Sequence, residues 1–163
     1  MIPTPYRLAD VPDGWTGWIR GRIAGADTLV APLSSRRCVY FHLLAKADDD
    51  MAAIGQRAGG GPLTLDDGTG RAIVDLAGAY VHVRYDVIEQ VQDSALLRSV
   101  GVRRPYLLRE GVLEAGQELV VHGRCQRDVD RDPRRMQDYR SPPPTLVRIV
   151  RGAQVRPWVT EVE

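Results

Sequence analysis

The most constraining feature of this sequence is a pair of alternating segments joined by a tight turn. Apolar and polar residues alternate over 63–65, and they alternate again over 72–76, after the letters DDGTG. Asp67-Gly68 supplies the positive φ that a tight turn between antiparallel strands requires, so the segment predicts a β-hairpin. This hairpin is the clearest local indication of structure in the chain.

Several other segments show the two-residue period of a half-buried strand. Residues 18–23 place isoleucines on one face and arginines on the other. Both faces of residues 37–44 are rather apolar, which favours a central position in a sheet. Further strands are predicted over 80–85, 119–125, 146–150 and 155–162.

One helix and three irregular segments complete the expected organisation. Apolar residues at helical spacing, an N-cap at Asp86 and a terminating Gly101 predict a helix over 86–99. Glycines, prolines and charge runs predict irregular structure elsewhere. These segments are a lead-in over 1–14, a mobile loop over 46–62 and an Arg-rich arm over 127–145.

Length and composition bound the fold class. The chain has 163 residues, with 44% hydrophobic and 26% charged side chains, which excludes wholesale disorder and suits one domain over 15–163. Because short strands joined by turns dominate, we predict an all-β protein. The specific expectation is a small OB-like β-barrel with one helix and long surface loops, since closure of a barrel removes exposed strand edges.

The sequence offers little for metal or catalytic chemistry. Two cysteines, Cys38 and Cys125, are too few for a zinc finger or RING domain, which needs about four ligands for each ion. Three aspartates over 128–132 resemble the start of a calcium loop, but the positions for the turn glycine and the final acid hold proline and tyrosine. A zinc triad would require three strand histidines, His42, His82 and His122, to converge. We therefore expect no cofactor, no metal and no enzymatic activity.

Binding of single-stranded nucleic acid is one alternative function. A small barrel with aromatic and basic residues on its strand faces can combine base stacking with charge. The overall net charge of +1 gives this hypothesis no general support. The residues that would serve it are Trp18, Arg20, Tyr40, Arg84 and Arg124.

Three segments, in order along the chain, resemble the GIDE domain, which is found beside the membrane in a mitochondrial E3 ubiquitin ligase of animals and in bacterial and plant proteins. The matching residues of the first segment are Leu29, Pro32, Ser34, Cys38 and Phe41. Those of the second are Pro62, Leu63, Leu65, Asp67 and Gly70. Those of the third are Gly116, Leu119, Val121 and Gly123.

The resemblance implies an OB-like barrel that acts as a non-catalytic protein-interaction module, as a bacterial relative of a membrane-associated, E3 ubiquitin ligase-related family without the RING. Its partner would be an unidentified protein. Arginines of the arm, Arg134, Arg135 and Arg140, would pair with acidic groups on that partner. No segment has the roughly 18 to 20 apolar residues of a spanning helix, so we expect a cytoplasmic chain. It would lie at the membrane face if an anchor exists outside these residues.

Overall fold

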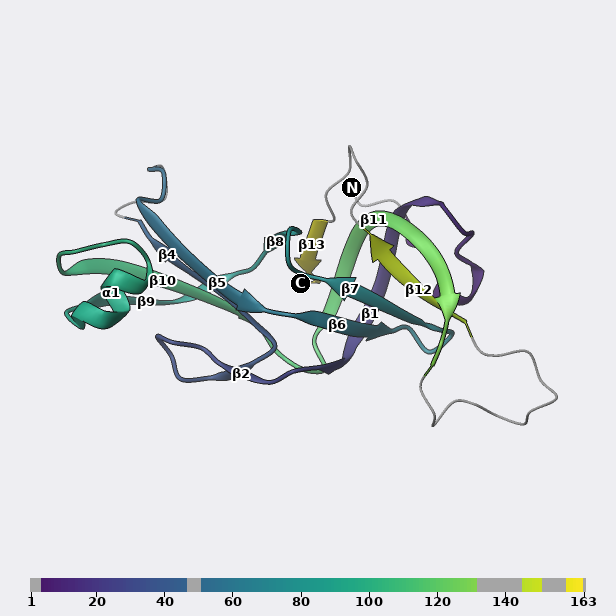
Figure 1. Ribbon diagram of the computed structural model, residues 1–163, viewed down its shortest axis with the longest axis horizontal. Coiled ribbons are helices and arrows are strands. Elements are labelled where there is room, and N and C mark those ends of the chain that lie inside the picture. Colours follow the sequence, from purple (N-terminus) through teal and green to yellow (C-terminus); the bar gives the residue numbers. More distant parts are fainter. Residues whose placement is uncertain (1–3, 47–50, 132–144, 151–157, 163) are drawn as a thin grey trace. The chain divides into compact units, whose positions relative to one another are not determined.

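The computed structural model describes residues 4–46, 51–131, 145–150 and 158–162 (Figure 1). The chain divides into two compact units, and each is described by itself. Unit 1 contains Met1–Ala26, Pro62–His82 and Gly116–Glu163. Unit 2 contains Asp27–Gly61 and Val83–Ala115. In the described part of the chain, no helix has the length and apolar character needed to cross a membrane.

Unit 1 is a closed five-stranded barrel. Its strands are β1 (Thr16–Ala26), β6 (Pro62–Asp66), β7 (Arg71–Asp75), β11 (Glu118–Val129) and β12 (Thr145–Val150). They pair in the order β1-β6-β7-β12-β11, and β11 pairs again with β1 to close the ring. The pairing of β7 with β12 is parallel and the other four pairings are antiparallel. This small barrel confirms the OB-like, all-β fold class.

Three shorter elements accompany the barrel. The first half of β11 also pairs with β13 (Trp158–Glu161), and β13 runs parallel to β8 (Tyr80–His82). A short 3-10 turn, η1 (Leu8–Asp10), precedes β1. Within the segment before β1, Leu8 and Val11 are almost fully buried, so part of this proline-rich lead-in belongs to the packed core.

The predicted hairpin is confirmed as β6 and β7. Asp66 lies opposite Arg71 in the antiparallel register, and the four residues between them form the turn. Gly68 adopts a φ of 83°, which a residue with a Cβ rarely adopts. The Asp67 carboxylate accepts hydrogen bonds from the amides of Thr69 and Gly70 at 2.8 and 2.9 Å and so holds the turn closed.

Alternation along the strands fills the barrel interior. Ile19 of β1, Leu65 of β6 and Val74 of β7 are each fully buried, as are Leu119 and Val121 of β11. Burial of one such side chain stabilises a fold by roughly 1.5–3 kcal/mol. The same alternation turns the side chains of Trp18, Arg20 and Arg22 outward from β1, and this places the site described below.

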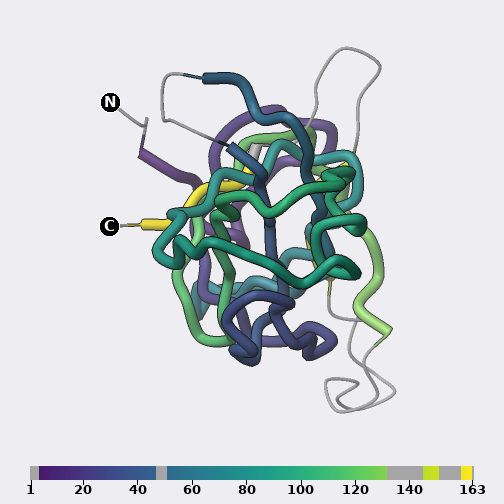
Figure 2. The backbone as a smooth tube through the Cα atoms, turned by 90° about the vertical axis from the view of Figure 1, so that its left-hand side faces the viewer, coloured from purple at the N-terminus to yellow at the C-terminus, as the bar shows by residue number. Residues whose placement is uncertain are grey.

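Unit 2 is built on a four-stranded antiparallel sheet. Its order is β5 (Gly55–Gly60), β4 (Tyr40–Ala45), β10 (Tyr106–Leu113) and β9 (Tyr85–Val91). The central place of β4 confirms the expectation drawn from its two apolar faces. In Figure 2 the blue and green segments of this unit run side by side, although β4 and β10 are distant in sequence.

The two faces of this sheet differ. One face packs against the helix α1 (Ser94–Ser99), with Leu43, Ala45 and Leu108 in a cluster around Leu97. A second cluster on this face includes Phe41 and Val112 and the residues near the short pair β2 (Leu29–Val30) and β3 (Arg37–Cys38). The opposite face takes part in neither cluster, and we call it the open face. The register places on it a mixture of apolar and polar residues, namely Tyr40, His42, Leu44, Gln56, Ala58, Ile88, Gln90, Leu107 and Arg109.

The expected helix over 86–99 was wrong for most of its length. Residues 85–91 form the strand β9, and the helix spans Ser94–Ser99 alone. Its N-cap is Asp93, whose carboxylate accepts hydrogen bonds from the amides of Ala95 and Leu96 at 2.7 and 3.1 Å. Valines four residues apart fit a helix or a strand, and the β-branched residues of β9 favour the strand once a neighbouring strand is present.

The expected loop over 46–62 was also wrong in its second half. Residues 55–60 form β5, which pairs with β4 over six residues from Tyr40–Gly60 to Ala45–Gly55. A run of glycines is typical of a loop, but backbone hydrogen bonds to β4 hold it extended. Gly59 lies against the Phe41 ring, where a Cβ would collide with ring atoms. Residues 47–50 lie outside the described residues.

Candidate functional site

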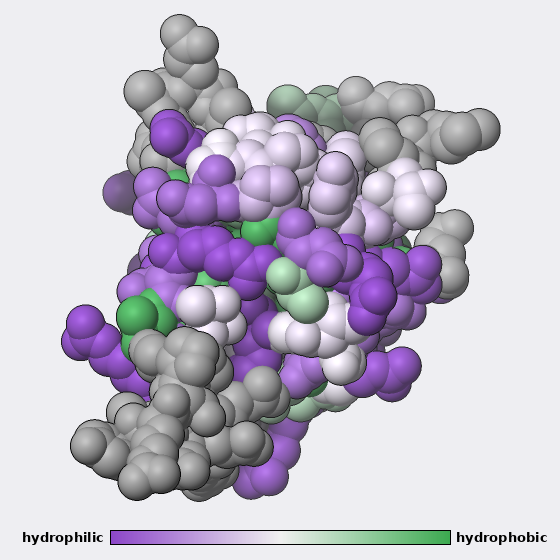
Figure 3. All heavy atoms as spheres, turned by 90° about the vertical axis from the view of Figure 1, so that its right-hand side faces the viewer, coloured by the Kyte–Doolittle hydropathy of each residue, from purple (hydrophilic) through white to green (hydrophobic). Residues whose placement is uncertain are grey.

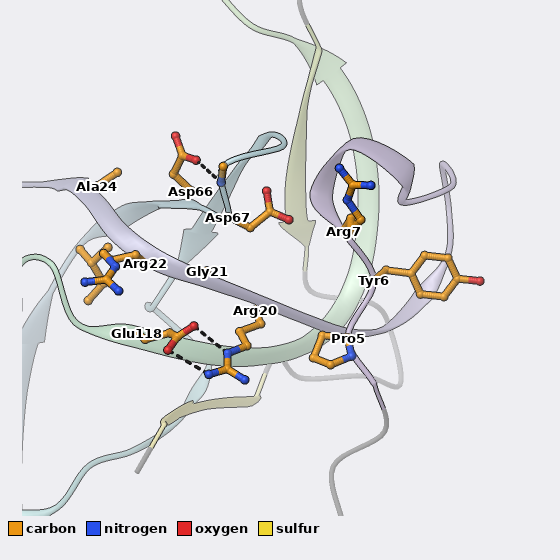
Figure 4. A pocket seen from close by; sticks show the side chains of 12 residues that line it. Pro5, Tyr6, Arg7, Arg20, Gly21, Arg22, Ala24, Asp66, Asp67 and Glu118 are labelled. Carbon is orange, nitrogen blue, oxygen red and sulfur yellow. Dashed lines mark hydrogen bonds and ion pairs between the residues drawn. The ribbon is translucent and has the colours of Figure 1, made fainter.

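A pocket of about 600 Å³ opens on the outer side of the barrel in unit 1 (Figure 4). It lies where the outer face of β1 meets the turn between β6 and β7, the start of β11 and the segment before β1. Most of its polar side chains are charged, and they are Arg7, Arg20, Arg22, Asp66, Asp67 and Glu118. Ordinary ligand pockets are lined mainly by hydrophobic and aromatic side chains, whereas six of the twelve residues that line this one are charged.

Arg20 and Glu118, which both line this pocket, are hydrogen-bonded to each other. The Arg20 Nε and Nη2 atoms donate to the two Glu118 carboxylate oxygens at 2.7 and 3.0 Å, and Figure 4 shows the two side chains pointing toward each other. This hydrogen-bonded pairing raises the pKa of Arg20 and lowers the pKa of Glu118. Both groups are open to solvent, so the pair orients the guanidinium more than it stabilises the fold.

Asp67, in the turn between β6 and β7, also lines the pocket. Its Oδ2 atom accepts a hydrogen bond from the Leu8 amide at 2.8 Å, and its Oδ1 atom accepts bonds within the turn. Burial raises the pKa of Asp67, but hydrogen bonds from Leu8, Thr69 and Gly70 outweigh burial and hold that pKa below its usual value. This carboxylate is therefore engaged by the protein itself and ties the lead-in to the hairpin.

Arg22 differs from the other cations of the pocket. It is exposed, and the hydrogen bond and charge of Arg20, together with the charge of Arg22, lower the pKa of Glu118. Arg7 is near Asp10, at 3.9 Å, and Arg20 is held by Glu118. Three arginines and three carboxylates line the pocket, so its total charge does not select strongly for an anion or a cation.

The outer faces of β1 and β11 continue from the pocket as a stripe of aromatic and basic side chains. Trp18 lies opposite His122 in the register, and their ring centroids are 4.9 Å apart. The neighbouring positions on the same faces are Arg20, two residues along β1, and Arg124, two residues along β11. The face of the molecule drawn in Figure 3 shows mainly hydrophilic and near-neutral side chains and few hydrophobic ones.

The residues predicted for nucleic-acid binding are thus partly brought together. Trp18, Arg20 and Arg124 lie on the outer faces of β1 and β11 in unit 1. Tyr40 belongs to unit 2 and is 7% exposed, so its prediction as a stacking residue was wrong. Burial raises the pKa of Tyr40 to about 12. Arg84 is an exposed residue of unit 2 between β8 and β9.

The other predicted residues either lie outside the described part of the chain or, where described, form no metal site. Arg134, Arg135 and Arg140 lie outside the described residues. In unit 2, His42 Nδ1 is 2.7 Å from the Tyr85 hydroxyl and Nε2 is 3.1 Å from the Gln56 carbonyl oxygen, so both ring nitrogens are occupied. Within the part of the chain that the structure describes, no group of three histidine, cysteine or acidic residues is placed to hold a metal ion.

Sequence reasoning missed the pocket because its residues come from distant segments. Arg20 and Glu118 are 98 positions apart, and the lead-in was expected to be irregular. One signal was present: Arg20 and Arg22 share the polar face of a predicted strand, which indicates a charged outer wall. No pattern in the sequence identifies Glu118 as the hydrogen-bond partner of Arg20.

The segments that resemble the GIDE domain supply structural residues. Cys38 and Phe41 pack in a cluster of unit 2, while Leu65 and Val121 fill the barrel of unit 1. Such positions maintain a fold and say little about what it binds. A comparison of this chain with protein-family models, with curated proteins and with solved structures finds no match.

Proposed function

We propose that this protein is a non-catalytic recognition module of the GIDE type that binds a protein segment on the open face of unit 2. One observation carries the proposal. The sheet has one face covered by α1 and the two core clusters, while the other face keeps Leu44 and Leu107 half-buried and leaves Ile88 50% exposed.

The open face has the mixture that protein interfaces use. Leu44, Ile88 and Leu107 supply apolar area. Arg109 lies between Leu44 and Ile88 in the register, and the hydrogen-bonded pair of His42 and Tyr85 adds oriented polar groups. Interfaces of this kind gain energy from apolar contacts and gain specificity from a few oriented polar groups. The support for a binding role is therefore this mixture of partly exposed apolar side chains and oriented polar groups on one sheet face.

The environment of the two cysteines supports a role without catalysis. Cys38 and Cys125 are both buried. Burial raises the pKa of Cys38, and burial raises the pKa of Cys125 to about 11. A thiol of this kind is a poor nucleophile near neutral pH.

The proposal can be tested with a pair of matched variants. A display library of random peptides is selected against the wild-type protein, and the affinity of an enriched peptide is measured by fluorescence anisotropy. Ala58→Arg places a charged side chain on the open face beside His42, while Ala95→Arg places the same side chain on the exposed surface of α1. We expect at least a tenfold loss of affinity for Ala58→Arg and little change for Ala95→Arg. Enrichment of no peptide, or equal binding to both variants, would reject the open face as the site.

A second candidate function, binding of single-stranded nucleic acid, is favoured by the contact of Trp18 with His122 beside Arg20 and Arg124. Aromatic rings and arginines on adjacent barrel strands can stack bases and contact phosphates. The strands that OB-folds commonly use, here β6 and β7, carry outward charges of both signs and no aromatic residue. The stripe on β1 and β11 is therefore the surface to test.

The test is a titration of labelled single-stranded DNA and RNA over a series of salt concentrations. Binding through this stripe should weaken steeply with salt and should fall in the Trp18→Ala and Arg124→Ala variants. The Arg98→Ala variant, which changes an exposed arginine of α1, is the control. Absence of binding at low salt, where charge interactions are strongest, would remove this function and leave the protein-recognition proposal intact.

A further inference from the structure

Strand β9 is an open edge of the unit 2 sheet. The sheet order ends at β9, which pairs with β10 on one side, and no described strand pairs with its other side. The strand is seven residues long and lacks proline and lysine, although it carries the carboxylates of Asp86 and Glu89 and a register shift against β10 at Asp86. Its outer backbone groups are thus available for pairing with another extended chain.

The side chains of β9 also favour pairing with another strand. Asp86, Ile88, Glu89 and Gln90 are exposed, and Ile88 at the midpoint of the strand is 50% exposed. A half-exposed isoleucine in the middle of an unpaired strand is unfavourable in water and favourable against a second apolar side chain. The opposite edge strand, β5, has three glycines among its six residues and offers no comparable side chain.

The charges on β9 distinguish between possible occupants of this edge. In an antiparallel pair of two copies, a twofold axis through Ile88 lies in the regular part of β9, which begins at Val87 after the register shift at Asp86. Ile88 then lies opposite the partner's Ile88, Asp86 lies opposite the partner's Gln90, and Val87 lies opposite the partner's Glu89. No two like charges face each other in this arrangement. A twofold axis shifted by one residue to Glu89 would instead place two carboxylates opposite each other, which is unfavourable.

We propose that two copies of this chain associate by antiparallel pairing of their β9 strands, with Ile88 facing Ile88 at the twofold axis. The association joins two four-stranded sheets into one continuous sheet of eight strands. An antiparallel pair keeps each face on its own side, so the two open faces become neighbours on one surface. This inference does not depend on what the open face binds.

The experiment combines sedimentation with site-specific cross-linking. Over a range of concentrations up to tens of micromolar, sedimentation equilibrium of the wild-type protein should show a rise from 18.1 kDa to twice that mass. Ile88→Lys places two positive charges opposite each other and should leave a single chain at all concentrations. Ile54→Lys, at another exposed isoleucine of unit 2, should behave like the wild type. Circular dichroism establishes that both variants are folded.

Cysteine variants test the register. Ile88→Cys should form a disulfide-linked dimer under mild oxidation, because directly opposite residues bring their Cβ atoms within about 4.5–5.5 Å. Gln90→Cys lies on the same face of the same strand, but its two copies would be four residues apart, or about 14 Å, which is too far for a disulfide. The native Cys38 and Cys125 are buried and should not compete.

Each outcome decides the proposal. A dimer that is lost in Ile88→Lys, together with cross-linking of Ile88→Cys in clear excess over Gln90→Cys, supports it. A single chain at every concentration overturns it, even if β9 then binds an extended peptide of another protein. A dimer that persists in Ile88→Lys, or equal cross-linking at both positions, also overturns it.

Discussion

The Arg127 guanidinium donates a hydrogen bond to the carbonyl oxygen of Ala9, at 2.6 Å, across 118 positions of the sequence. The same side chain donates to the carbonyl oxygens of Leu8 at 3.0 Å and Val11 at 2.9 Å. Three backbone acceptors on one guanidinium use the planar fork of arginine, which lysine does not possess. Arg127 thereby fixes the segment before β1 against β11, and this segment forms one wall of the pocket.

Replacement of Arg127 by methionine should lower the free energy of unfolding by about 2 kcal/mol, because charge-assisted hydrogen bonds to three carbonyl groups are lost. Denaturation by urea measures the change. Hydrogen exchange should also show faster exchange at the Leu8 amide and its neighbours. Arg124→Met, at an exposed arginine of the same strand, is the control and should change stability little. Equal stability of the two variants would show that the hydrogen bonds of Arg127 do not hold the segment before β1.

A second prediction concerns the contribution of Asp67 to stability at low pH. Its pKa in the folded protein is lowered, so the unfolded chain binds a proton there more readily than the folded chain. The stabilisation is fully present above the pKa of the unfolded state and is lost as the pH falls through the folded-state pKa. Asp67→Asn should therefore lower stability by about 1–2 kcal/mol at neutral pH and by less in acid.

The check on Asp67 is the unfolding free energy measured from neutral pH down to about pH 3, across the ordinary range of aspartate. Asp75→Asn, at an exposed position of β7, is the matched control. A constant difference between wild type and Asp67→Asn at every pH would contradict the role assigned to the ionised carboxylate.

The barrel was predictable from sequence because its strands follow a two-residue period with little interruption. Residues 18–23 and 63–76 each show the alternation that the structure confirms, and the turn at Asp67-Gly68 is specified by its own residues. Local pattern and tertiary packing agree in this part of the chain. In such segments a single sequence is sufficient.

Unit 2 was less predictable because tertiary contacts decide its structure. The glycines of β5 form a strand through their pairing with β4, and the valines of β9 fit a helix until β10 lies beside them. The strand β10 contains a charged residue, Glu110, that is fully buried, which is rare for a carboxylate. The pocket depends on pairs such as Arg20 and Glu118, which no local pattern connects.

His42 gives a third prediction, at mildly acidic pH. Burial lowers its pKa from the ordinary value of 6.5, although the hydrogen bond with Gln56 acts in the opposite direction. The unfolded chain therefore takes up a proton first as the pH falls. The stability that the neutral ring contributes is present above pH 6.5 and is lost as the pH falls through the folded-state pKa.

This dependence can be measured by titration of the His42 ring by NMR and by unfolding between neutral pH and about pH 5, the range in which histidines change charge. The His42→Gln variant should lose part of the pH dependence below neutral pH. Tyr85→Phe removes one hydrogen bond but retains the titrating ring, so its pH dependence should remain. An ordinary or raised pKa of His42 would contradict the prediction.

Glu110 provides the last prediction, because it is a fully buried carboxylate in the sheet of unit 2. Its two oxygens accept hydrogen bonds from the backbone amides of Leu33 and Ser34 at 2.7 and 3.0 Å, so it holds the connection between β2 and β3 against β10. In Glu110→Gln one acceptor oxygen becomes an amide NH₂ group that faces a backbone N–H donor. Loss of a charge-assisted bond and the mismatched donors should cost about 2–3 kcal/mol.

Urea denaturation of Glu110→Gln measures this cost, with Glu89→Gln on the exposed part of β9 as the control. The two substitutions remove the same charge, so a difference between them reports the buried hydrogen bonds and not the net charge. Hydrogen exchange at Leu33 and Ser34 should accelerate in the first variant alone. If both variants unfold at the same urea concentration, the two amides draw their protection from the surrounding cluster and not from Glu110.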